Sequence, residues 1–331
     1  MIVKEWILNK EDRLDLFLRG KLKELFKEEE LSNSKIRRLI IAGSVFVNGR
    51  QCRIPSYQLF PSSKVKVSID KEKLFYQKEN ADIDFTLSAK DILYEDDFLI
   101  IVNKPAFLPT EETFLEGRKN LHQCVVDYLW SKNPALKNPP YAGIMHRLDL
   151  ETSGAILFTK SRSVNPQIHK IFEERKIKKV YTAVSFAQGK LSPLVKETFT
   201  YEAYIKRISK KSQACKMGIC KKDDSDSLFS STDFKILSKD KDGFYYIQAT
   251  LNTGRTHQIR VHLSSLGLAI VGDQLYGSQK YFLDNKKRIM LHSTLLEFAH
   301  PVSGNLLKIT APLPPHFKNQ AERADQGDFK K

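Results

Sequence analysis

The stretch His146-Arg147-Leu148-Asp149-Leu150-Glu151-Thr152-Ser153-Gly154 leads into the apolar run 155–158. The run is typical of a buried strand, and the Thr-Ser-Gly sequence before it predicts a turn. Asp149 lies between two leucines just before this turn, so we expect its carboxylate at the edge of the core, partly withdrawn from water. Such a carboxylate needs a cation close by. The alternative is an aspartate that stabilises the turn and pairs with Arg147.

A second polar stretch, 252–262, reads Asn-Thr-Gly-Arg-Thr-His-Gln-Ile-Arg-Val-His. It predicts a helix that Thr256 caps and that ends at Gly267. Arg260 lies beside the apolar face of this helix. A guanidinium stays charged and binds carboxylates through two hydrogen bonds, so Arg260 is the candidate counter-ion for Asp149. The alternative for Arg260 is a surface contact with an RNA phosphate.

The other polar residues of these stretches suit phosphate or RNA better than a metal. Arg255, one residue before the expected cap, is placed for a phosphate. His257 and His262 are five residues apart and lie on different helix faces, unlike the metal-binding pair of zinc proteases. We expect these histidines, with His146 and His292, to be structural or RNA-contacting. No metal and no cofactor are expected.

Outward from the two stretches, strands and helices interleave. Helices are expected at 121–130 and 163–175, and strands at 92–94, 98–102, 155–158, 180–186, 234–237 and 244–251. The order lacks the regular strand–helix–strand repeat of a doubly wound sheet. The sequence therefore predicts an α+β fold, with a mixed, largely antiparallel sheet in a domain at 91–315. A small α/β domain at 1–75, a linker at 76–90 and a frayed tail at 316–331 complete the expected organisation.

The front domain carries segregated positive charge. We expect a helix from Asp12 to Phe26, a second helix that Ser34 caps and that ends at Gly43, and strands around an Asn48-Gly49 turn and at 64–69. Residues 31–69 contain seven Lys and Arg and no Asp or Glu. RNA binding is preferred over a solvated basic face without a partner, and the candidate contacts are Lys35, Arg37, Arg38, Arg50 and Arg53. Segment 205–222, also with seven cations and no acid, is either a second RNA-facing surface or a solvated insertion.

Composition limits the class of protein. The 331 residues have a formal charge of +15 with 41% apolar residues, which fits a globular protein with a polyanionic partner, RNA before membrane. The sequence shows neither a signal peptide nor a run of apolar residues long enough to span a membrane. The four scattered cysteines favour a reducing compartment. We expect a monomeric cytoplasmic protein.

The two polar stretches resemble signatures of the RluA-type family of pseudouridine synthases. The family pattern His-Arg-Leu-Asp followed by Thr-Ser-Gly stands at 146–154, and Gly-Arg-Thr-His-Gln-Ile-Arg-Val-His stands at 254–262. Lys179-Val180-Tyr181, Gly272-Asp273 with Tyr276-Gly277, and Leu291-His292 also fit. The front domain resembles the RNA-binding domain named after the fourth protein of the small ribosomal subunit, the S-four type. One departure is Phe107, where a glycine is usual, so the shape of that loop is in question.

The resemblance implies an RNA pseudouridine synthase, most typically for large-subunit ribosomal RNA. Asp149 would be the nucleophile or general base, Tyr181 would stack on the flipped base, and Arg260 would hold Asp149 ionised. Arg147 would fill the gap that the extruded nucleotide leaves, and Leu291 would line the uracil pocket. On its own, Tyr181 also fits a buried aromatic residue of a strand. A catalytically silent RNA-binding or ribosome-assembly factor and a tRNA pseudouridine synthase are the alternatives.

Overall fold

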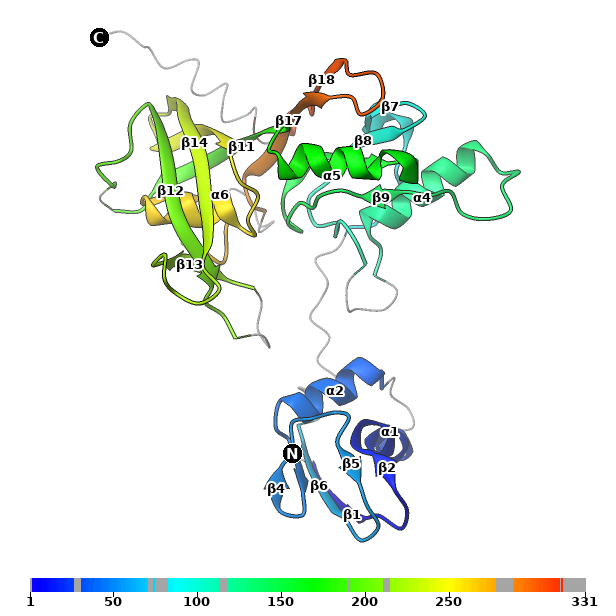
Figure 1. Ribbon diagram of the computed structural model, residues 1–331. Helices are drawn as coiled ribbons and strands as arrows, with labels where there is room; N and C mark the ends of the chain where they lie inside the picture. Colours follow the sequence, from blue (N-terminus) through cyan, green and yellow to red (C-terminus); the bar gives the residue numbers. More distant parts are fainter. Residues whose placement is uncertain are drawn as a thin grey trace. The chain divides into compact units, whose positions relative to one another are not determined.

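The computed structural model describes residues 2–26, 31–70, 74, 83–112, 118–189, 191–210, 215–277, 288–315 and 317. The chain divides into two compact units, Met1–Ala81 and Asp82–Lys331, which are described separately (Figure 1). Within the described residues no helix combines the length and apolar character that a membrane crossing requires.

The front unit packs two helices against a small sheet. The sheet has the order β1-β6-β3-β4, formed by β1 (Ile2–Ile7), β6 (Lys64–Ile69), β3 (Val45–Val47) and β4 (Arg50–Gln51). β2 (Asp12–Arg13) pairs with β5 (Gln58–Leu59), and the helices are α1 (Leu14–Leu25) and α2 (Asn33–Ile41). Val65, Val67 and Ile69 of β6 are fully buried, as their alternation with polar residues predicts. The Asn48-Gly49 turn is confirmed, with both residues at positive φ.

Both expected helix caps in this unit are wrong by one or two residues. α1 begins at Leu14, and Asp12 belongs to β2. The first backbone N–H groups of α1 donate to the carbonyls of Tyr57 and Pro55 from the neighbouring loop, so no side-chain cap is needed. At α2, Ser32 rather than Ser34 accepts from the backbone N–H of Lys35. The expected end of α2 at Gly43 is confirmed, since its φ of 82° is left-handed.

The second unit is built on one large, mostly antiparallel sheet of 12 described strands, and this α+β fold is the one predicted. Its main order is β13-β12-β14-β15-β11-β17-β10-β8-β7. These strands are β7 (Ile92–Glu95), β8 (Leu99–Lys104), β10 (Ser153–Thr159), β11 (Lys178–Ala187), β12 (Thr198–Arg207), β13 (Met217–Cys220), β14 (Leu228–Lys239), β15 (Phe244–Leu251) and β17 (Leu291–Ala299). Three short strands pair at the side: β9 (Gly143–Ile144) with β10, β16 (Leu268–Ile270) with β11, and β18 (Leu306–Thr310) with β17.

Helices cover the sheet and explain its apolar strands. Residues of α4 (Leu121–Lys132) and α6 (Gln258–Ser265) share one core with Ile100, Val102, Ile156 and Phe158. α5 (Asn165–Glu173) contributes to another core. That second core takes the alternate residues of β8 and β10, namely Leu99, Ile101, Ala155 and Leu157. Both faces of these two strands are therefore buried, as a continuous apolar run requires.

The centre of the sheet contains its one parallel pair among the described strands, β10 with β17. Ser153 pairs with His292, and Gly154 pairs with Ser293. Gly154 has a φ of 114°, and a Cβ there would lie 2.2 Å from the carbonyl oxygen of Ser293. Only glycine permits this approach. The strand that follows Asp149 is thereby fixed beside β17 and, across β17, near β11.

Several sequence expectations for the second unit need adjustment. Part of the expected linker, 83–90, packs on this unit, because Ile83, Phe85 and Leu87 point into its core. Segment 205–222 contains the end of β12 and all of β13, which pair with each other, while 211–214 lie outside the described residues. In the expected tail, Phe317 is buried against the ring of His292, whereas 316 and 318–331 lie outside the described residues.

Candidate active site

A cleft of about 1140 Å³ lies where the chain enters β10, β11 and α6. Its walls come from the segment before β10, the end of α5, the first residues of β11 and the connection between β15 and α6. The seven catalytic and substrate-binding residues that the sequence predicts all line this cleft. They are Asp149, Tyr181, Arg260, Arg147, Arg255, His257 and Leu291.

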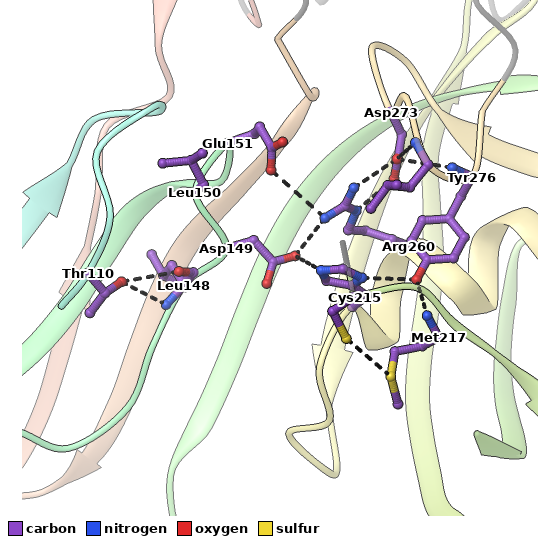
Figure 2. A network of polar contacts seen from close by, with 12 residues as sticks. Thr110, Leu148, Asp149, Leu150, Glu151, Cys215, Met217, Arg260, Asp273 and Tyr276 are labelled. Atoms are coloured by element: carbon purple, nitrogen blue, oxygen red, sulfur yellow. Dashed lines mark hydrogen bonds and ion pairs between the residues drawn. The ribbon is translucent and has the colours of Figure 1, made fainter. Parts of the chain in front are cut away.

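Asp149 and Arg260 form an ion pair at the floor of the cleft. Nη1 of Arg260 donates to Oδ2 of Asp149 at 3.0 Å, although 111 residues separate the two along the chain (Figure 2). The side chain of Asp149 is 27% exposed and that of Arg260 is 3% exposed. The structure thus places the predicted counter-ion beside Asp149. The alternative partner, Arg147, pairs with Glu111.

A second carboxylate, that of Asp273, binds the guanidinium of Arg260 through two hydrogen bonds. Nε of Arg260 donates to Oδ2 of Asp273 at 2.8 Å, and Nη2 donates to Oδ1 at 2.9 Å. Burial alone would lower the pKa of Arg260, but the hydrogen bonds and charges of Asp273, and then of Asp149, outweigh it and raise the pKa. Three N–H groups of Arg260 thus donate to carboxylates, two to Asp273 and one to Asp149, and the guanidinium stays charged.

The contacts of Asp149 with described residues fall on one oxygen. Oδ2 accepts from Arg260 and lies 3.7 Å from Nε2 of His257. No described residue donates to Oδ1 of Asp149, which leaves that oxygen for a group in the cleft. Glu151 is a weaker neighbour, with its Oε2 at 3.9 Å from Nη1 of Arg260.

Residues 104–110 hold the backbone around Asp149. The Lys104 side chain is fully buried, and its Nζ donates to the carbonyls of Pro105, Leu108 and Leu150 at 3.0, 2.8 and 3.1 Å. Burial lowers the pKa of Lys104, whereas three carbonyl acceptors match the three N–H groups of the ammonium. The hydroxyl of Thr110 both donates to Leu148 O and accepts from Leu148 N (Figure 2).

Phe107, which replaces the usual glycine, keeps a glycine-like backbone. Its φ is 65°, and its backbone N–H donates to the carbonyl of Leu150 at 2.8 Å. Left-handed φ is costly for a side chain of this kind. This hydrogen bond ties the loop to the turn that carries Asp149.

Tyr181 and Leu291 form the apolar part of the cleft. They come from the adjacent strands β11 and β17, and they are 6% and 4% exposed. Burial raises the pKa of Tyr181, and Ser293 hydrogen-bonds its hydroxyl. The phenol therefore keeps its proton at neutral pH. A flat aromatic side chain and a leucine beside a carboxylate suit a planar base held next to its sugar.

The N-terminus of α6 differs from expectation. Thr256 is not the cap, since α6 begins at Gln258 and His257 occupies the cap position with a left-handed φ of 55°. The side chain of Gln258 folds back, and its Oε1 accepts from Arg255 N and from the hydroxyl of Thr253. The helix starts later for that reason, and His257 is turned toward Asp149.

The remaining histidines of the two stretches are bonded inside the unit. His262 lies between the hydroxyls of Ser230 and Thr232, at 2.8 and 3.0 Å, and burial lowers its pKa to about 4. Nε2 of His146 accepts from the backbone N–H of Leu157 at 3.0 Å. Nδ1 of His292 lies 2.8 Å from the hydroxyl of Ser153. These roles are structural, and the described residues contain no cluster of three or more His, Cys, Asp or Glu side chains that could hold a metal.

Other cations surround the cleft. Arg255 lines it while its Nε donates to Phe229 O at 3.1 Å, and Arg147 is exposed at the rim. Lys179, two residues before Tyr181, also lines the cleft, and burial lowers its pKa. Its Nζ lies over the ring of Phe172, 5.6 Å from the centroid. We missed Lys179, Lys104 and Asp273 as individual site residues, although Asp273 and Lys179 stand in quoted motifs.

The candidate RNA contacts of the front unit lie on its surface. Arg37, Arg50 and Arg53 are exposed, and Lys35 is half-buried. Arg38 belongs to α2, but its side chain lies outside the described residues. No Asp or Glu occurs in residues 31–69, although Asp15 of α1 is close enough to feel the charge of Arg37.

Known proteins resemble this chain in sequence. The sequence model of the family described as RNA pseudouridylate synthase matches residues 98–265. The chain is 31% identical to ribosomal large subunit pseudouridine synthase C of Buchnera aphidicola over 336 residues, which cover 94% of each protein. It is 29% identical to ribosomal large subunit pseudouridine synthase D of Haemophilus influenzae over 308 residues, which cover 89% of this chain and 87% of the relative.

The fold is also that of solved structures. Human RNA pseudouridylate synthase domain containing 4 is 23% identical, with a TM-score of 0.56 over 71% of this chain and 92% of the human chain. This likeness shows that the two chains share a fold. The chain belongs to the RNA pseudouridylate synthase family.

Proposed function

We propose that the protein converts uridines of large-subunit ribosomal RNA to pseudouridine at this cleft, with Asp149 as the nucleophile or general base. The observation that carries the proposal is the Asp149 carboxylate, half-withdrawn from water and held by an arginine that cannot lose its charge or move. The substrate class follows the relatives, which are named as ribosomal large subunit synthases.

The isomerisation of uridine exchanges one glycosidic bond for another. The bond from N1 of uracil to C1′ of ribose breaks, and a bond from C5 to C1′ forms. C5 loses a proton and N1 gains one, so atoms and electrons balance without an oxidant. Oδ1 of Asp149 faces the cleft and either attacks C1′ or removes a ribose proton, while Arg260 keeps the carboxylate ionised through Oδ2.

The other cleft residues bind and orient the nucleotide. Tyr181 stacks on the extruded base, and Leu291 closes the uracil pocket on the neighbouring strand. Arg255 and Lys179 supply positive charge for the backbone of the flipped nucleotide. Arg147 at the rim occupies the space in the RNA that the extruded nucleotide leaves.

The front unit supplies affinity in this proposal. Its positive residues, Lys35, Arg37, Arg38, Arg50 and Arg53, lie in a stretch without acids and neutralise phosphates of the RNA, as an S-four-type domain does. The protein acts as a monomer in the cytoplasm, where ribosomal RNA is processed. Its four cysteines are free thiols, which suits that compartment.

Mapping pseudouridines in total RNA tests the proposal. Carbodiimide treatment and primer extension are compared between cells with the gene, without it, and with an Asp149→Asn copy. We expect one or more stops in large-subunit rRNA to vanish without the gene and to stay absent with Asp149→Asn. Loss confined to tRNA would exclude the ribosomal substrate, and an unchanged map would favour a silent RNA-binding or assembly factor.

A further inference from the structure

The hydroxyl of Tyr276 joins two elements beside the ion pair of Asp149 and Arg260. It accepts a hydrogen bond from the backbone N–H of Met217 at 2.7 Å, at the first residue of β13 (Figure 2). The same oxygen lies 2.9 Å from Nδ1 of His257. Neither contact is needed to hold Arg260 or Asp149, so this arrangement requires another explanation.

The hydrogen atoms of this contact can be assigned by counting donors and acceptors. Burial raises the pKa of Tyr276 to about 12, so the hydroxyl keeps its hydrogen at neutral pH. The N–H of Met217 is a donor and cannot receive that hydrogen. Among the described residues, Nδ1 of His257 is the acceptor in reach. Nδ1 then bears no hydrogen, and a neutral imidazole must carry its hydrogen on Nε2.

Nε2 of His257 faces the carboxylate. It lies 3.7 Å from Oδ2 of Asp149, beyond a direct hydrogen bond but on the same side of the cleft. Burial lowers the pKa of His257, and the positive charge of Arg260 acts in the same direction against the negative charges of Asp149, Asp273 and Glu151. The imidazole is therefore neutral and presents an N–H toward Oδ2 of Asp149.

We propose that Tyr276 is a positioning residue that fixes His257 as the Nε2–H tautomer, so that His257 acts as a hydrogen-bond donor beside Asp149 and not as a base. The N–H group donates to an oxygen of the bound ribose or to Oδ2 of Asp149 when the nucleotide closes the cleft. The donor role of His257 rests on the proposed function, in which Asp149 is the reacting group. The tautomer of His257 does not depend on that function.

The backbone supports a fixed orientation of His257. A non-glycine residue at a φ of 55° is uncommon and persists only where its surroundings determine it. Here the side chain of Gln258 binds both Arg255 N and the hydroxyl of Thr253 and fixes the turn. The ring of His257 also meets the ring of Tyr276 edge to face, with centroids 5.7 Å apart. Such strain at a site points to function.

Nitrogen NMR of the full-length protein, with ¹⁵N-labelled histidine, measures the tautomer without any assay of activity. The chain has eight histidines, and the His257 signals are identified as those missing from His257→Gln. We expect a protonated Nε2 and an unprotonated Nδ1 at neutral pH. In Tyr276→Phe, which lacks the hydroxyl, this preference should be lost. A protonated Nδ1 in the wild type would overturn the proposal, and so would an unchanged Nε2–H tautomer in Tyr276→Phe.

Kinetics test the role of the N–H group. For Tyr276→Phe we expect kcat to fall about tenfold, the value of one hydrogen bond, with KM unchanged. Tyr201→Phe is the matched control, because the Tyr201 hydroxyl contacts Ser265 away from the cleft, and it should stay within about twofold. A loss in both variants, or in KM alone, would mark a structural role.

Two substitutions of His257 separate donation from folding. Glutamine places an amide N–H near the position of Nε2, whereas asparagine reaches only that of Nδ1 but tolerates a left-handed backbone better. We expect His257→Gln to be less stable yet about tenfold more active than His257→Asn. Greater activity of the asparagine variant would refute the donor role. If Asp149→Asn kept full turnover, the proposed role of Asp149 as the reacting group would fail while the NMR result still stood.

Discussion

Arginines of the two units have opposite surroundings. Arg50 and Arg53 of the front unit are exposed, in a stretch that contains no acid. Arg260 of the second unit is 3% exposed and is bonded to two carboxylates. Water and salt therefore screen the charges of Arg50 and Arg53. The charge of Arg260 is buried in the protein and is screened much less.

The difference teaches how one chain can carry two kinds of positive charge. Exposed cations attract polyanions over a distance, and the strength of that attraction falls as salt rises. The buried arginine does little at a distance, because Asp149 and Asp273 compensate it, but its geometry fixes the Asp149 carboxylate. Variants of the cleft should change turnover without changing the salt dependence of binding, and variants of the front unit should do the reverse.

The largest effect is expected for Asp149→Asn, which keeps size and hydrogen bonding but removes the charge. Tritium release from C5 of labelled RNA should fall by roughly 10⁴-fold or more, while RNA affinity and its salt dependence stay at wild-type values. Glu151→Gln, two residues away in the same turn, is the control and should lose less than about threefold, since its carboxylate is 3.9 Å from Arg260. Turnover near wild type in Asp149→Asn would assign the chemistry elsewhere.

Arg260→Met should reduce kcat/KM by roughly 10² to 10³-fold and move the acid limb of the pH profile to higher pH. A desolvated carboxylate without its cation is protonated more readily, so a higher pH is needed to ionise it. Leaving Asp149 and Asp273 unpaired should also lower the free energy of unfolding by about 3 to 5 kcal/mol. Denaturant unfolding and pH profiles measure both effects. An equal loss at every pH, together with weaker RNA binding, would instead identify Arg260 as a phosphate contact.

Lys104→Met should act through the backbone of the Asp149 turn. The carbonyls of Pro105 and Leu108 lose this donor, and that of Leu150 keeps only the N–H of Phe107. The free energy of unfolding should therefore fall by about 2 to 4 kcal/mol, and kcat should fall more than KM rises. Lys90→Met, at an exposed lysine of the same unit, should change stability by less than about 0.5 kcal/mol. Equal stability of the two variants would show that the three hydrogen bonds of Lys104 contribute nothing net.

The smallest effect on turnover is expected from the front unit. Replacing Lys35, Arg37, Arg50 and Arg53 by glutamine removes four positive charges. Each phosphate contact contributes about 0.7 to 0.9 to the slope of log affinity against log salt concentration, so this slope should flatten by roughly 3. Turnover at saturating RNA should remain within about twofold. The control replaces four exposed lysines that do not line the cleft, Lys137, Lys235, Lys241 and Lys308, and should leave the slope unchanged. Equal slopes for the two variants would reject the RNA-binding role of the front unit.

The sequence predicted the pair Asp149 and Arg260 because both stand in short motifs beside apolar elements. Asp273 was missed as the third member because it lies in a loop, where no periodicity indicates which way a side chain points. Lys104 was missed because a lysine at the end of an apolar strand normally faces water, and nothing local shows that three carbonyls surround it.

The strands that the sequence did not predict include the edge strand β1 and the inner strands β12 and β17. β1 was missed because three consecutive exposed residues, Val3 to Glu5, interrupt the alternation, and its identity depends on pairing with β6, more than 50 residues away. The Thr256 cap failed because other contacts hold the turn before α6: Oε1 of Gln258 accepts from Arg255 N, and Gln258 N donates to Arg255 O. Tertiary contacts decided both cases, and single-sequence patterns do not contain them.

The parallel pairing of β10 with β17 has a consequence for folding and synthesis. Ser153 meets His292 across 139 residues, so the loop that this contact closes is long and its formation is entropically slow. Leu291, which lines the cleft, precedes His292 and lies in one of the last strands of the sheet. A chain still being synthesised has its Asp149 turn before Leu291 has been added. The cleft is therefore complete only after β17 has been translated.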